Sequence, residues 1–400
     1  PNRLPPAVKT VDANGGLIMP GLVNTHTHLP MTLFRGLADD LPLQQWLENH
    51  IFPAERRHIN PDSVTVGVRL ACAEMICSGT TTCCDGYFLE DAVAAAVQET
   101  GLRAIPGQGV IDFPAPGVGD PTKNIEHARG FVAQWLQADP RLTPSIFCHS
   151  PYTCSEDTLK QAKAAATEAG VLFQIHVAET QQEHDGLMAG HGMTPIGYLD
   201  RLGLLDDCSL LVHCVKVNPN DIDIMARTGV SVSHCPDSNA KLAAGIAPAP
   251  QMTAAGITVG LGTDSCASNN SLDMLRTMEL AAKLHKVNTS DPTVMDALTV
   301  LRMATLVGAR ALGLDHLTGS LETGKQADVI IVNTRQPHLT PIYHPVSHLV
   351  YAACGSDVET SIVAGRLLME NRQLVTIDLP PLLKAAVGLA RSIGQTGVGA

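Results

Sequence analysis

The sequence lacks any run of about 18 consecutive apolar residues, which excludes a transmembrane helix of ordinary length. It also lacks a CxxC pair although it contains 11 cysteines, and scattered thiols in odd number are typical of buried, reduced cysteines in a cytosolic protein. Positive charge is scarce: the formal net charge is -12, which argues against a nucleic-acid groove and against an anionic membrane surface as partners. The first ten residues show no signal-peptide pattern. We therefore expect a cytoplasmic protein that binds neither nucleic acid nor membranes.

Short apolar segments alternate with helical segments from residue 21 to about residue 320. Strands that alternate with helices imply parallel βα units, and eight such units predict an α/β protein with a closed (β/α)₈ TIM barrel. An open, doubly wound sheet is the alternative, but the chain has no GxGxxG segment that opens a helix. The expected strands lie within residues 21–28, 79–88, 101–112, 142–150, 171–180, 208–217, 229–238 and 256–265.

The two ends of the chain have a different pattern. Residues 11–19 and 320–378 contain short strand-like segments that are broken by turn residues. This pattern predicts a small antiparallel sheet in which the two ends of the chain meet. An amphipathic helix follows from about residue 380 and passes into a glycine-rich tail, which we expect to fray.

Polar residues stand at the ends of the expected strands, where a barrel places its catalytic groups. His26 and His28 end the first strand, and residues two apart on a strand point to the same face, so both can bind one ion. His176 ends the fifth strand and Asp264 ends the eighth. Three imidazoles and one carboxylate form a ligand set that zinc accepts in a catalytic site. The alternative interpretation is a set of core histidines that happen to end strands.

Other strand ends carry residues with two or more interpretations. Glu179 follows His176 by three positions and is either an acid–base group near a metal-activated water or a glutamate that complements a helix N-terminus. His213, at the end of the sixth strand, is a ligand, a proton shuttle or a core residue, and His234, at the end of the seventh, shapes the pocket or caps its strand. The fourth strand ends in "IFCHS" without a lysine that could be carboxylated to bridge two metals, which favours one metal.

Several motifs together resemble one family. The segments "PGLVNTHTHLPMTLFRGLADDLPLQQWL", "FPAE", "HSPYT", "HVAET", "HCPDSNAKLAAG" and "GTDSCASNN" resemble the amidohydrolase superfamily, and within it the branch of methylthioadenosine/S-adenosylhomocysteine deaminases and triazine chlorohydrolases. The resemblance covers about residues 11–378. It implies a barrel over residues 20–319, a β-sandwich domain formed from residues 1–19 and 320–378, and a C-terminal helix and tail over residues 379–400.

The resemblance also implies one divalent metal per subunit, usually zinc, although three histidines and an aspartate accept iron or manganese as well. Only the resemblance assigns Glu55 to the site. Without it, a solvated helix charge beside Arg56 and Arg57 would be the expected role of Glu55. Trp46 is either an aromatic of the pocket or a core residue. The matched positions are the ligands His26, His28, His176 and Asp264, the acid–base residue Glu179, His213 as a contact of the metal-bound water, Glu55 and His149 as contacts of ribose and purine, and Trp46 as a pocket aromatic.

The implied activity is hydrolytic deamination of a small-molecule adenine nucleoside to the inosine analogue and ammonia. Candidate substrates are 5′-methylthioadenosine, S-adenosylhomocysteine and adenosine. Relatives that use S-adenosylhomocysteine hold its carboxylate with arginines between strands 3 and 4, but here Lys123 and Arg129 do not stand in equivalent places, so an uncharged 5′ group is favoured. Assembly into a homo-oligomer is a further expectation.

Alternative functions place a different substrate at the same site. One is deamination of a free purine or pterin, or dechlorination of an s-triazine, in which the same activated water attacks a ring carbon. Another is hydrolysis of a cyclic amide, which usually needs two metals and the lysine that strand 4 lacks. A barrel that binds metal without catalysis is the alternative from a different class.

Overall fold

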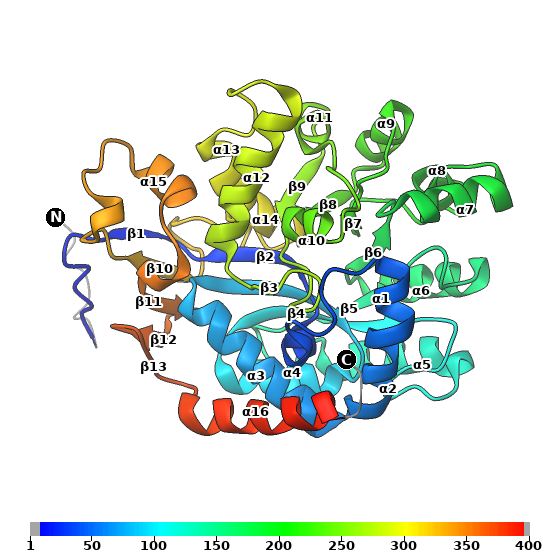
Figure 1. Ribbon diagram of the computed structural model, residues 1–400, viewed down its shortest axis with the longest axis horizontal. Coiled ribbons are helices and arrows are strands. Elements are labelled where there is room, and N and C mark those ends of the chain that lie inside the picture. The colour runs from blue at the N-terminus through cyan, green and yellow to red at the C-terminus, as the bar shows by residue number, and fades with distance from the viewer. Residues whose placement is uncertain (1–8, 396–400) are drawn as a thin grey trace.

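A parallel barrel forms the body of the protein, whose computed structural model describes residues 9–395 (Figure 1). Eight parallel strands follow one another around the sheet in chain order, β2-β3-β4-β5-β6-β7-β8-β9. The predicted (β/α)₈ barrel is therefore confirmed. The strands are β2 (Leu22–Thr27), β3 (Thr80–Tyr87), β4 (Arg103–Val110), β5 (Ser145–Cys148), β6 (Phe173–Val177), β7 (Ser209–His213), β8 (Ser231–His234) and β9 (Thr258–Leu261).

The barrel strands are buried along almost their whole length because both of their faces are covered, although several of their residues are polar. Every residue of β3 and of β4 is buried, for example. Side chains close the seam between the first strand and the last: the Asn24 amide donates to the Thr263 hydroxyl at 2.7 Å, and the Thr263 backbone N–H donates to Asn24 Oδ1 at 3.0 Å. A bridge between Thr27 and Asp264 extends this seam to the carboxyl ends of the strands.

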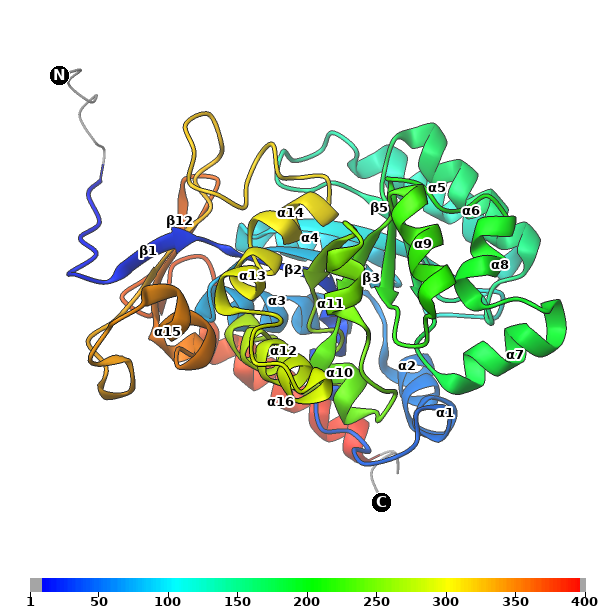
Figure 2. The ribbon, with the colours of Figure 1, turned by 90° about the horizontal axis from the view of Figure 1, so that it is seen from above.

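Helices surround the barrel, as Figure 2 shows from above. Their ends follow local capping signals: Asn60 caps α3 with a capping box, and Ser155 and Thr180 cap α6 and α7 through their hydroxyls. The helices around the barrel are α3 (Pro61–Cys77), α4 (Glu90–Thr100), α5 (Asn124–Trp135), α6 (Glu156–Ala169), α7 (Gln181–His191), α8 (Pro195–Arg201), α9 (Pro219–Thr228), α10 (Pro236–Lys241), α11 (Ala249–Ala254), α12 (Met274–Thr289), α13 (Ala297–Met303) and α14 (Leu306–Ala311).

The connection from β2 to α3 contains helical segments of its own. A 3₁₀ helix (Leu29–Phe34) comes first, then α1 (Leu43–Trp46), a π-helical segment (Leu47–Ile51) and α2 (Phe52–His58). The last three of these segments form one continuous helical stretch from residue 43 to residue 58. Long connections at the carboxyl end of a barrel commonly carry binding residues, which makes this segment a candidate wall of the site.

The two ends of the chain meet in a small antiparallel sheet, as expected from their sequence pattern (Figure 1). Its order is β1-β10-β11-β12-β13, and β1 pairs with β10 so that Leu17 lies opposite Val332. Within residues 9–395 these strands form one sheet rather than two facing sheets. The domain division over residues 1–19 and 320–378, 20–319 and 379–400 stays a prediction. The strands are β1 (Leu17–Pro20), β10 (Val329–Val332), β11 (Val358–Val363), β12 (Arg366–Glu370) and β13 (Gln373–Leu374).

Two further helices complete the described chain. Helix α15 (Pro345–Tyr351) lies between β10 and β11, and α16 (Leu379–Gln395) packs along α3 (Figure 1). The expected C-terminal helix is thus present, while the expected fraying tail falls on residues 396–400, outside the described residues. None of the helices described is long and apolar enough to cross a membrane.

A buried ion pair joins the barrel to the small sheet. Arg103, at the start of β4, donates from Nε to Asp328 Oδ2 at 2.8 Å and from Nη2 to Asp328 Oδ1 at 3.1 Å. The same carboxylate accepts the Ala364 backbone N–H at 2.7 Å and the Thr318 hydroxyl at 3.0 Å. Asp328 therefore holds the barrel, β10 and the turn after β11 together.

We predict that Asp328→Ala lowers the free energy of unfolding by about 3–5 kcal/mol, because it leaves the Arg103 guanidinium buried without its counter-charge. Equilibrium denaturation in urea measures the change. Glu168→Ala is the matched control: it breaks the pair between Glu168 and Arg129, whose side chains are 61% and 47% exposed, and is expected to leave the free energy of unfolding nearly unchanged. Equal losses in the two variants would contradict the role assigned to Asp328.

Candidate metal centre

The four residues predicted as metal ligands lie together at the carboxyl end of the barrel. His26 Nε2 is 3.2 Å from His28 Nε2 and 3.0 Å from His176 Nε2. Asp264 Oδ1 is 3.2 Å from His28 Nε2 and 3.6 Å from His26 Nε2. All four ligand atoms lie within 4.8 Å of one another. Strands β2 and β6 and the residues after β9 therefore bring three imidazoles and a carboxylate to one point.

These spacings fit a tetrahedral cation. Zinc with bonds of about 2.0–2.1 Å to nitrogen and oxygen separates its ligand atoms by about 3.3 Å. The four measured separations run from 3.0 to 3.6 Å and lie on both sides of that value. Nitrogen and oxygen atoms at these distances converge without any movement of the backbone. The group could thus hold a metal ion.

Neighbouring groups orient the ligand atoms. His28 Nδ1 donates to the Gly86 carbonyl, which leaves its Nε2 free to face the other ligands. Asp264 Oδ2 accepts the hydroxyls of Ser238 at 2.6 Å and Ser268 at 2.8 Å, and only Oδ1 is left for the histidines. Asp264 has φ +61°, a left-handed backbone conformation that aspartate tolerates better than most residues.

The pKa shifts of three of the four ligands favour the protonation states that ligation needs, whereas a binding cation has to displace a proton from His28. Burial holds the pKa of His26 and of His176 well below the usual histidine value, so both are neutral. For Asp264 burial opposes ionisation, but the hydrogen bond and charge of His28 hold the pKa of the carboxyl well below its usual range. Burial disfavours a charge on His28 too, yet Asp264 outweighs it and raises the His28 pKa. Neutral imidazoles beside an ionised carboxylate are the donors that a divalent cation requires.

Asp85, which was not predicted as a site residue, supports the segment that carries His26 and His28. Its Oδ1 accepts the Thr27 hydroxyl at 2.8 Å and the Leu29 backbone N–H at 2.6 Å, so it grips the two residues on either side of His28. A charged residue inside the otherwise apolar and hydroxyl-bearing run "TTTCCDGYF" was the available signal. Asp85 therefore fixes the place where β2 ends and the chain turns.

A cavity of about 770 Å³ opens over the ligand cluster. Its wall includes three of the four ligands, whereas His26 is fully buried beneath them. The cavity brings together every other residue predicted for the site. Those residues are Trp46, Glu55, His149, Glu179 and His213.

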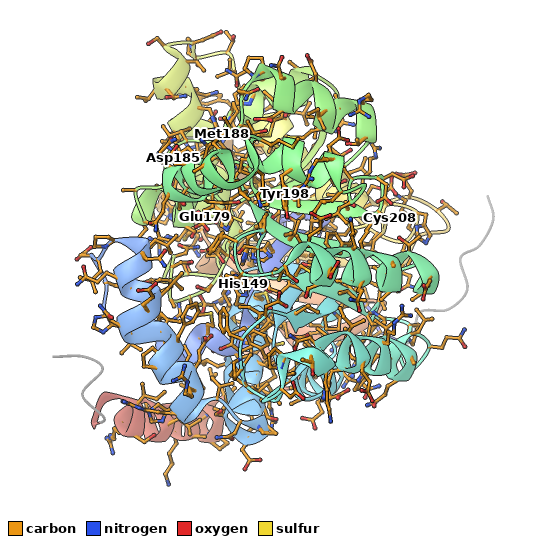
Figure 3. The ribbon with its side chains drawn as sticks, turned by 90° about the vertical axis from the view of Figure 1, so that its right-hand side faces the viewer. His149, Glu179, Asp185, Met188, Tyr198 and Cys208 are labelled. Carbon is orange, nitrogen blue, oxygen red and sulfur yellow. The ribbon has the colours of Figure 1, made fainter. Side chains whose placement is uncertain are left out.

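Glu179 faces the cavity from the turn between β6 and α7 (Figure 3). Thr180 is the N-cap of α7, so Glu179 precedes the helix and does not belong to its first turn. Glu183 occupies the first turn instead, and its carboxylate accepts the backbone N–H groups of Ala178 and Glu179, both at 2.8 Å. Burial raises the pKa of Glu179, which favours its protonated form.

His213 stands beside Glu179 at the end of β7. Its Nδ1 is 2.9 Å from Asn239 Oδ1, and because that oxygen can only accept, His213 carries its proton on Nδ1. Its Nε2 is then a free acceptor, 3.9 Å from Glu179 Oε2. His213 has φ +76°, a strained backbone conformation of the kind that persists at functional sites. Neither Asn239 nor Glu183 was predicted from sequence.

Glu55 reaches the cavity from α2, and its side chain is buried rather than solvated. The Tyr87 hydroxyl, at the end of β3, donates to Glu55 Oε1 at 2.5 Å. Burial raises the pKa of Glu55 to about 7, although the Tyr87 hydrogen bond opposes the shift. The solvated-charge interpretation of Glu55 is therefore wrong, and Tyr87 is a further site residue that the sequence did not indicate.

His149 and Trp46 both line the cavity wall. His149 lies after β5, with its Nδ1 3.0 Å from the Thr153 hydroxyl, and burial lowers its pKa to about 4 (Figure 3). Trp46 is only 5% exposed and bonds weakly through Nε1 to the Leu37 carbonyl at 3.4 Å. Trp46 is thus a core residue that also presents one edge to the cavity.

Three residues considered from sequence lie away from the cavity wall. His234 is buried behind it, with its Nε2 3.0 Å from that of His285 in α12. Lys123 and Arg129 are exposed, and Arg129 pairs with Glu168 on the outside of the barrel. His234 therefore neither binds the cluster nor touches a ligand in the cavity.

Sequence comparisons agree with this geometry. Residues 17–368 match a profile described as the amidohydrolase family. The 5-methylthioadenosine/S-adenosylhomocysteine deaminase of Syntrophobacter fumaroxidans is 46% identical over 387 residues, which span 97% of this chain and 88% of that protein. The 5′-deoxyadenosine deaminase of Methanothermobacter thermautotrophicus is 46% identical over 398 residues, which span 98% and 91%.

A solved structure resembles this fold closely. The crystal structure of an adenosine deaminase from Xanthomonas campestris with bound zinc aligns with a TM-score of 0.93 and 40% identity. The alignment covers 94% of this chain and 86% of that one. The similarity extends over the barrel and the small sheet alike, since no single part of the chain could account for that coverage.

Proposed function

The chain belongs to the amidohydrolase family, and from that premise we propose that it hydrolytically deaminates adenine nucleosides, with one bound divalent cation per subunit. The products are the inosine analogue and ammonia. The observation that carries the proposal is a single cavity that contains both kinds of group. Three of the four possible metal ligands and Glu179 lie on its wall, and so does Glu55. The ligand cluster comprises His26, His28, His176 and Asp264. One end of the cavity suits hydrolysis, and the other suits a sugar with hydroxyl groups.

Zinc is the cation we propose, as in the Xanthomonas campestris enzyme, because three imidazoles and one carboxylate at tetrahedral spacing suit it. A cation held by these four residues supplies Lewis-acid activation of a water molecule and of the electron-poor ring. His28, His176 and Asp264 line the cavity, so a cation held there would be accessible from the side where the substrate enters.

Proton transfers are assigned to three side chains. Asp264 and the free Nε2 of His213 accept the proton that the attacking water loses as its oxygen bonds to C6. Glu179, whose raised pKa favours the acid form, donates its proton to N1, so that the ring accepts electrons without forming an anion. Asp264 or His213 then returns its proton to the exocyclic nitrogen, so that the C6–N bond breaks and ammonia leaves, while the new hydroxyl on C6 gives its proton to Glu179 as the C6=O bond forms. Water and nucleoside thus balance inosine analogue and ammonia.

Glu55 is proposed to accept hydrogen bonds from the ribose hydroxyls. The Tyr87 hydroxyl already occupies Oε1, so Oε2 is left for the substrate. A carboxylate is a stronger acceptor than a neutral oxygen, particularly when it is shielded from water. His149 faces the same space and is proposed to contact the purine.

The 5′ group is proposed to be uncharged and small, as in 5′-methylthioadenosine or 5′-deoxyadenosine. Phe52 lies one helical turn before Glu55, and its ring meets Phe113, from the loop after β4, with centroids 5.7 Å apart. Leu47 and Pro114 extend this apolar part of the wall. A homocysteine tail would place an ammonium and a carboxylate against these side chains, which costs free energy unless they are paired.

The proposed function is tested with purified, zinc-loaded protein and a panel of 5′-methylthioadenosine, 5′-deoxyadenosine, adenosine, S-adenosylhomocysteine, adenine and an aminopterin. We expect ammonia release and loss of adenine absorbance with the first three compounds. No release from any nucleoside would end the proposal. Release from adenine or the pterin alone would favour a free-base deaminase, and no hydrolysis at all would favour a binding protein.

The 5′ preference has its own test within the same panel. We expect kcat/KM for S-adenosylhomocysteine to be about tenfold or more below that for 5′-methylthioadenosine, because its charged tail is left unpaired. Arg56 is the one Lys or Arg side chain on the described cavity wall. Equal kcat/KM for both substrates, with Arg56→Ala selectively impairing S-adenosylhomocysteine, would show that Arg56 binds the carboxylate and that the preference is wrong.

Tyr87→Phe is expected to shift the pH dependence of kcat/KM. If Glu55 binds ribose as a carboxylate, kcat/KM falls as the pH drops through the Glu55 pKa of about 7. Removing the Tyr87 hydroxyl removes a bond that lowers this pKa, so the acidic limb moves to higher pH. Tyr343→Phe, at a tyrosine 90% exposed, is the control and leaves the profile unchanged. A limb that stays in place in Tyr87→Phe would contradict the role of Glu55.

Two expectations concern the whole protein rather than the site. The cytoplasmic location and the assembly into a homo-oligomer stay predictions. Fractionation of cells that express the full natural chain tests the first, and light scattering of the purified protein tests the second.

A further inference from the structure

A second cluster of possible metal ligands lies in the segment that connects β10 to β11 of the small sheet. That sheet is on the far side of the barrel from α7 and α8 (Figures 1 and 2). The cluster comprises His338, Cys354 and Asp357. His338 belongs to a short 3₁₀ helix (Pro337–Leu339) after β10, and Asp357 ends another (Gly355–Asp357) directly before β11. The three ligand atoms lie within 4.8 Å of one another. The proposed deaminase reaction uses none of these residues.

The separations in this cluster fit tetrahedral zinc. Asp357 Oδ2 is 2.9 Å from His338 Nε2 and 3.4 Å from Cys354 Sγ. With zinc bonds of about 2.3 Å to sulfur and 2.0–2.1 Å to nitrogen and oxygen, the corresponding edges of a tetrahedron are about 3.3 and 3.5 Å. One thiolate, one imidazole and one carboxylate are a mixed donor set that a borderline cation such as Zn²⁺ prefers to Mg²⁺ or Ca²⁺.

The backbone that carries two of the ligands is held in place from outside the cluster. The Gly355 N–H donates to Asp273 Oδ2 at 2.9 Å, and Arg372 Nη1 donates to the Gly355 carbonyl at 2.9 Å. The Asn333 N–H donates to the Asp357 carbonyl at 2.7 Å. The segment from 354 to 357 is therefore fixed before any cation arrives, which lowers the entropy cost of binding.

The side chains of His338 and Asp357 differ in solvent exposure, and one exposed ligand is what a cation needs in order to enter the site. The Asp357 side chain is 4% exposed, whereas that of His338 is 46% exposed. A cation can approach along the His338 side, and solvent can fill the fourth position. The alternative is a hydrogen-bond network alone, in which Asp357 accepts from His338 and from the Cys354 N–H at 2.9 Å each.

We propose that His338, Cys354 and Asp357 bind a second divalent cation of the Zn²⁺ type, separate from the barrel centre. The thiol proton passes to solvent as the sulfur binds. The bound ion ties residue 338 to residues 354–357 and so closes the segment that contains α15, which packs on α12 and α13. The cation stabilises the folded state by mass action, by an amount that grows with the logarithm of its free concentration once this exceeds the Kd.

Cobalt(II) distinguishes the two sites by their donor atoms. A thiolate bound to Co²⁺ gives an intense near-ultraviolet charge-transfer band, whereas the barrel cluster offers only nitrogen and oxygen donors. Titrating metal-free wild-type protein with Co²⁺ should therefore produce this band, and Zn²⁺ should displace it. With excess Zn²⁺, elemental analysis should give about two ions per chain in the wild type and about one in Cys354→Ser.

Matched variants locate the thiolate. Cys354→Ser should abolish the band and keep deaminase activity, whereas Cys208→Ser, at an exposed cysteine before β7, should keep both (Figure 3). His338→Ala should raise the Co²⁺ concentration for half-saturation at least about tenfold, because one of the ligand bonds is lost. No band at saturating Co²⁺ in the wild type, or a band that persists in Cys354→Ser, would overturn the proposal. Neither result bears on the proposed deaminase activity.

Discussion

Glu179→Gln is expected to lower kcat for nucleoside deamination by about 10²–10⁴-fold while zinc content stays as in the wild type. The amide keeps the size and position of the side chain but has no acidic proton to give to N1. The turn that carries residue 179 is held by Glu183 through backbone N–H groups, so the substitution leaves it in place. Steady-state kinetics with 5′-methylthioadenosine and elemental analysis of the same sample measure both quantities.

Two further Glu→Gln variants separate chemistry from binding and from general damage. Glu55→Gln should act mainly on KM, raising it by about tenfold or more, because it weakens a charge-assisted bond to ribose. Glu168→Gln, on the outside of the barrel, should leave kcat and KM unchanged. A Glu179→Gln variant with wild-type kcat would show that another group protonates the ring, and a variant without zinc would show a structural role instead.

The barrel strands and their polar ends were predictable because both depend on short-range patterns. A short, largely apolar run followed by a polar residue predicts both the end of a strand and the side chain at that end. His26 and His28 follow such a run in β2, and Asp264 follows one in β9. Eight repeats of that pattern then fix the closed architecture, and closure brings strand ends from residues 26 and 264 to within hydrogen-bond distance. The proximity of the His26 and Asp264 side chains is therefore a direct consequence of barrel closure.

Residues that act through tertiary contacts were not predictable in the same way. Glu55 lies in the polar stretch "ERRH" of α2, and only the fold of residues 43–58 over the cavity buries it against Tyr87. Asn239, which sets the tautomer of His213, belongs to α10, one βα unit further along the chain. Such pairings depend on how loops pack over the barrel, and no spacing in the sequence encodes that packing.

Buried histidines need not belong to the site, as His234 in β8 and His285 in α12 illustrate. His234 resembles His26 in sequence, since each is a histidine near the end of a buried strand. The Nε2 atoms of His234 and His285 lie 3.0 Å apart, yet no carboxylate joins them, and burial keeps the pKa of each below the usual histidine value. The difference between the two histidine groups is the carboxylate of Asp264, which only the barrel cluster includes.

Removal of the cation is expected to lower kcat by about 10⁴-fold or more, because activation of water is the largest barrier reduction that this site can provide. Dialysis against a chelator, followed by addition of Zn²⁺, tests the expectation with the wild-type chain and should restore activity in proportion to bound zinc. His176→Ala should be as inactive as the metal-free protein and should not recover with Zn²⁺. In His176→Ala the remaining ligands are His26, His28 and Asp264. The first two are only two residues apart, so we expect these three donors to enclose a cation incompletely.

Cys354→Ser is the control that keeps this test specific to the barrel centre. The Cys354→Ser protein lacks a ligand of the second cluster but has all four barrel ligands. Chelation and zinc addition should therefore change its activity as they change that of the wild type. Metal-free protein that keeps its full kcat would mean that Asp264 and His213 activate water unaided. That outcome is not expected, because a buried carboxylate whose pKa is held well below its usual range is too weak a base to deprotonate water efficiently. We therefore expect catalysis that uses Asp264 to depend on the bound cation.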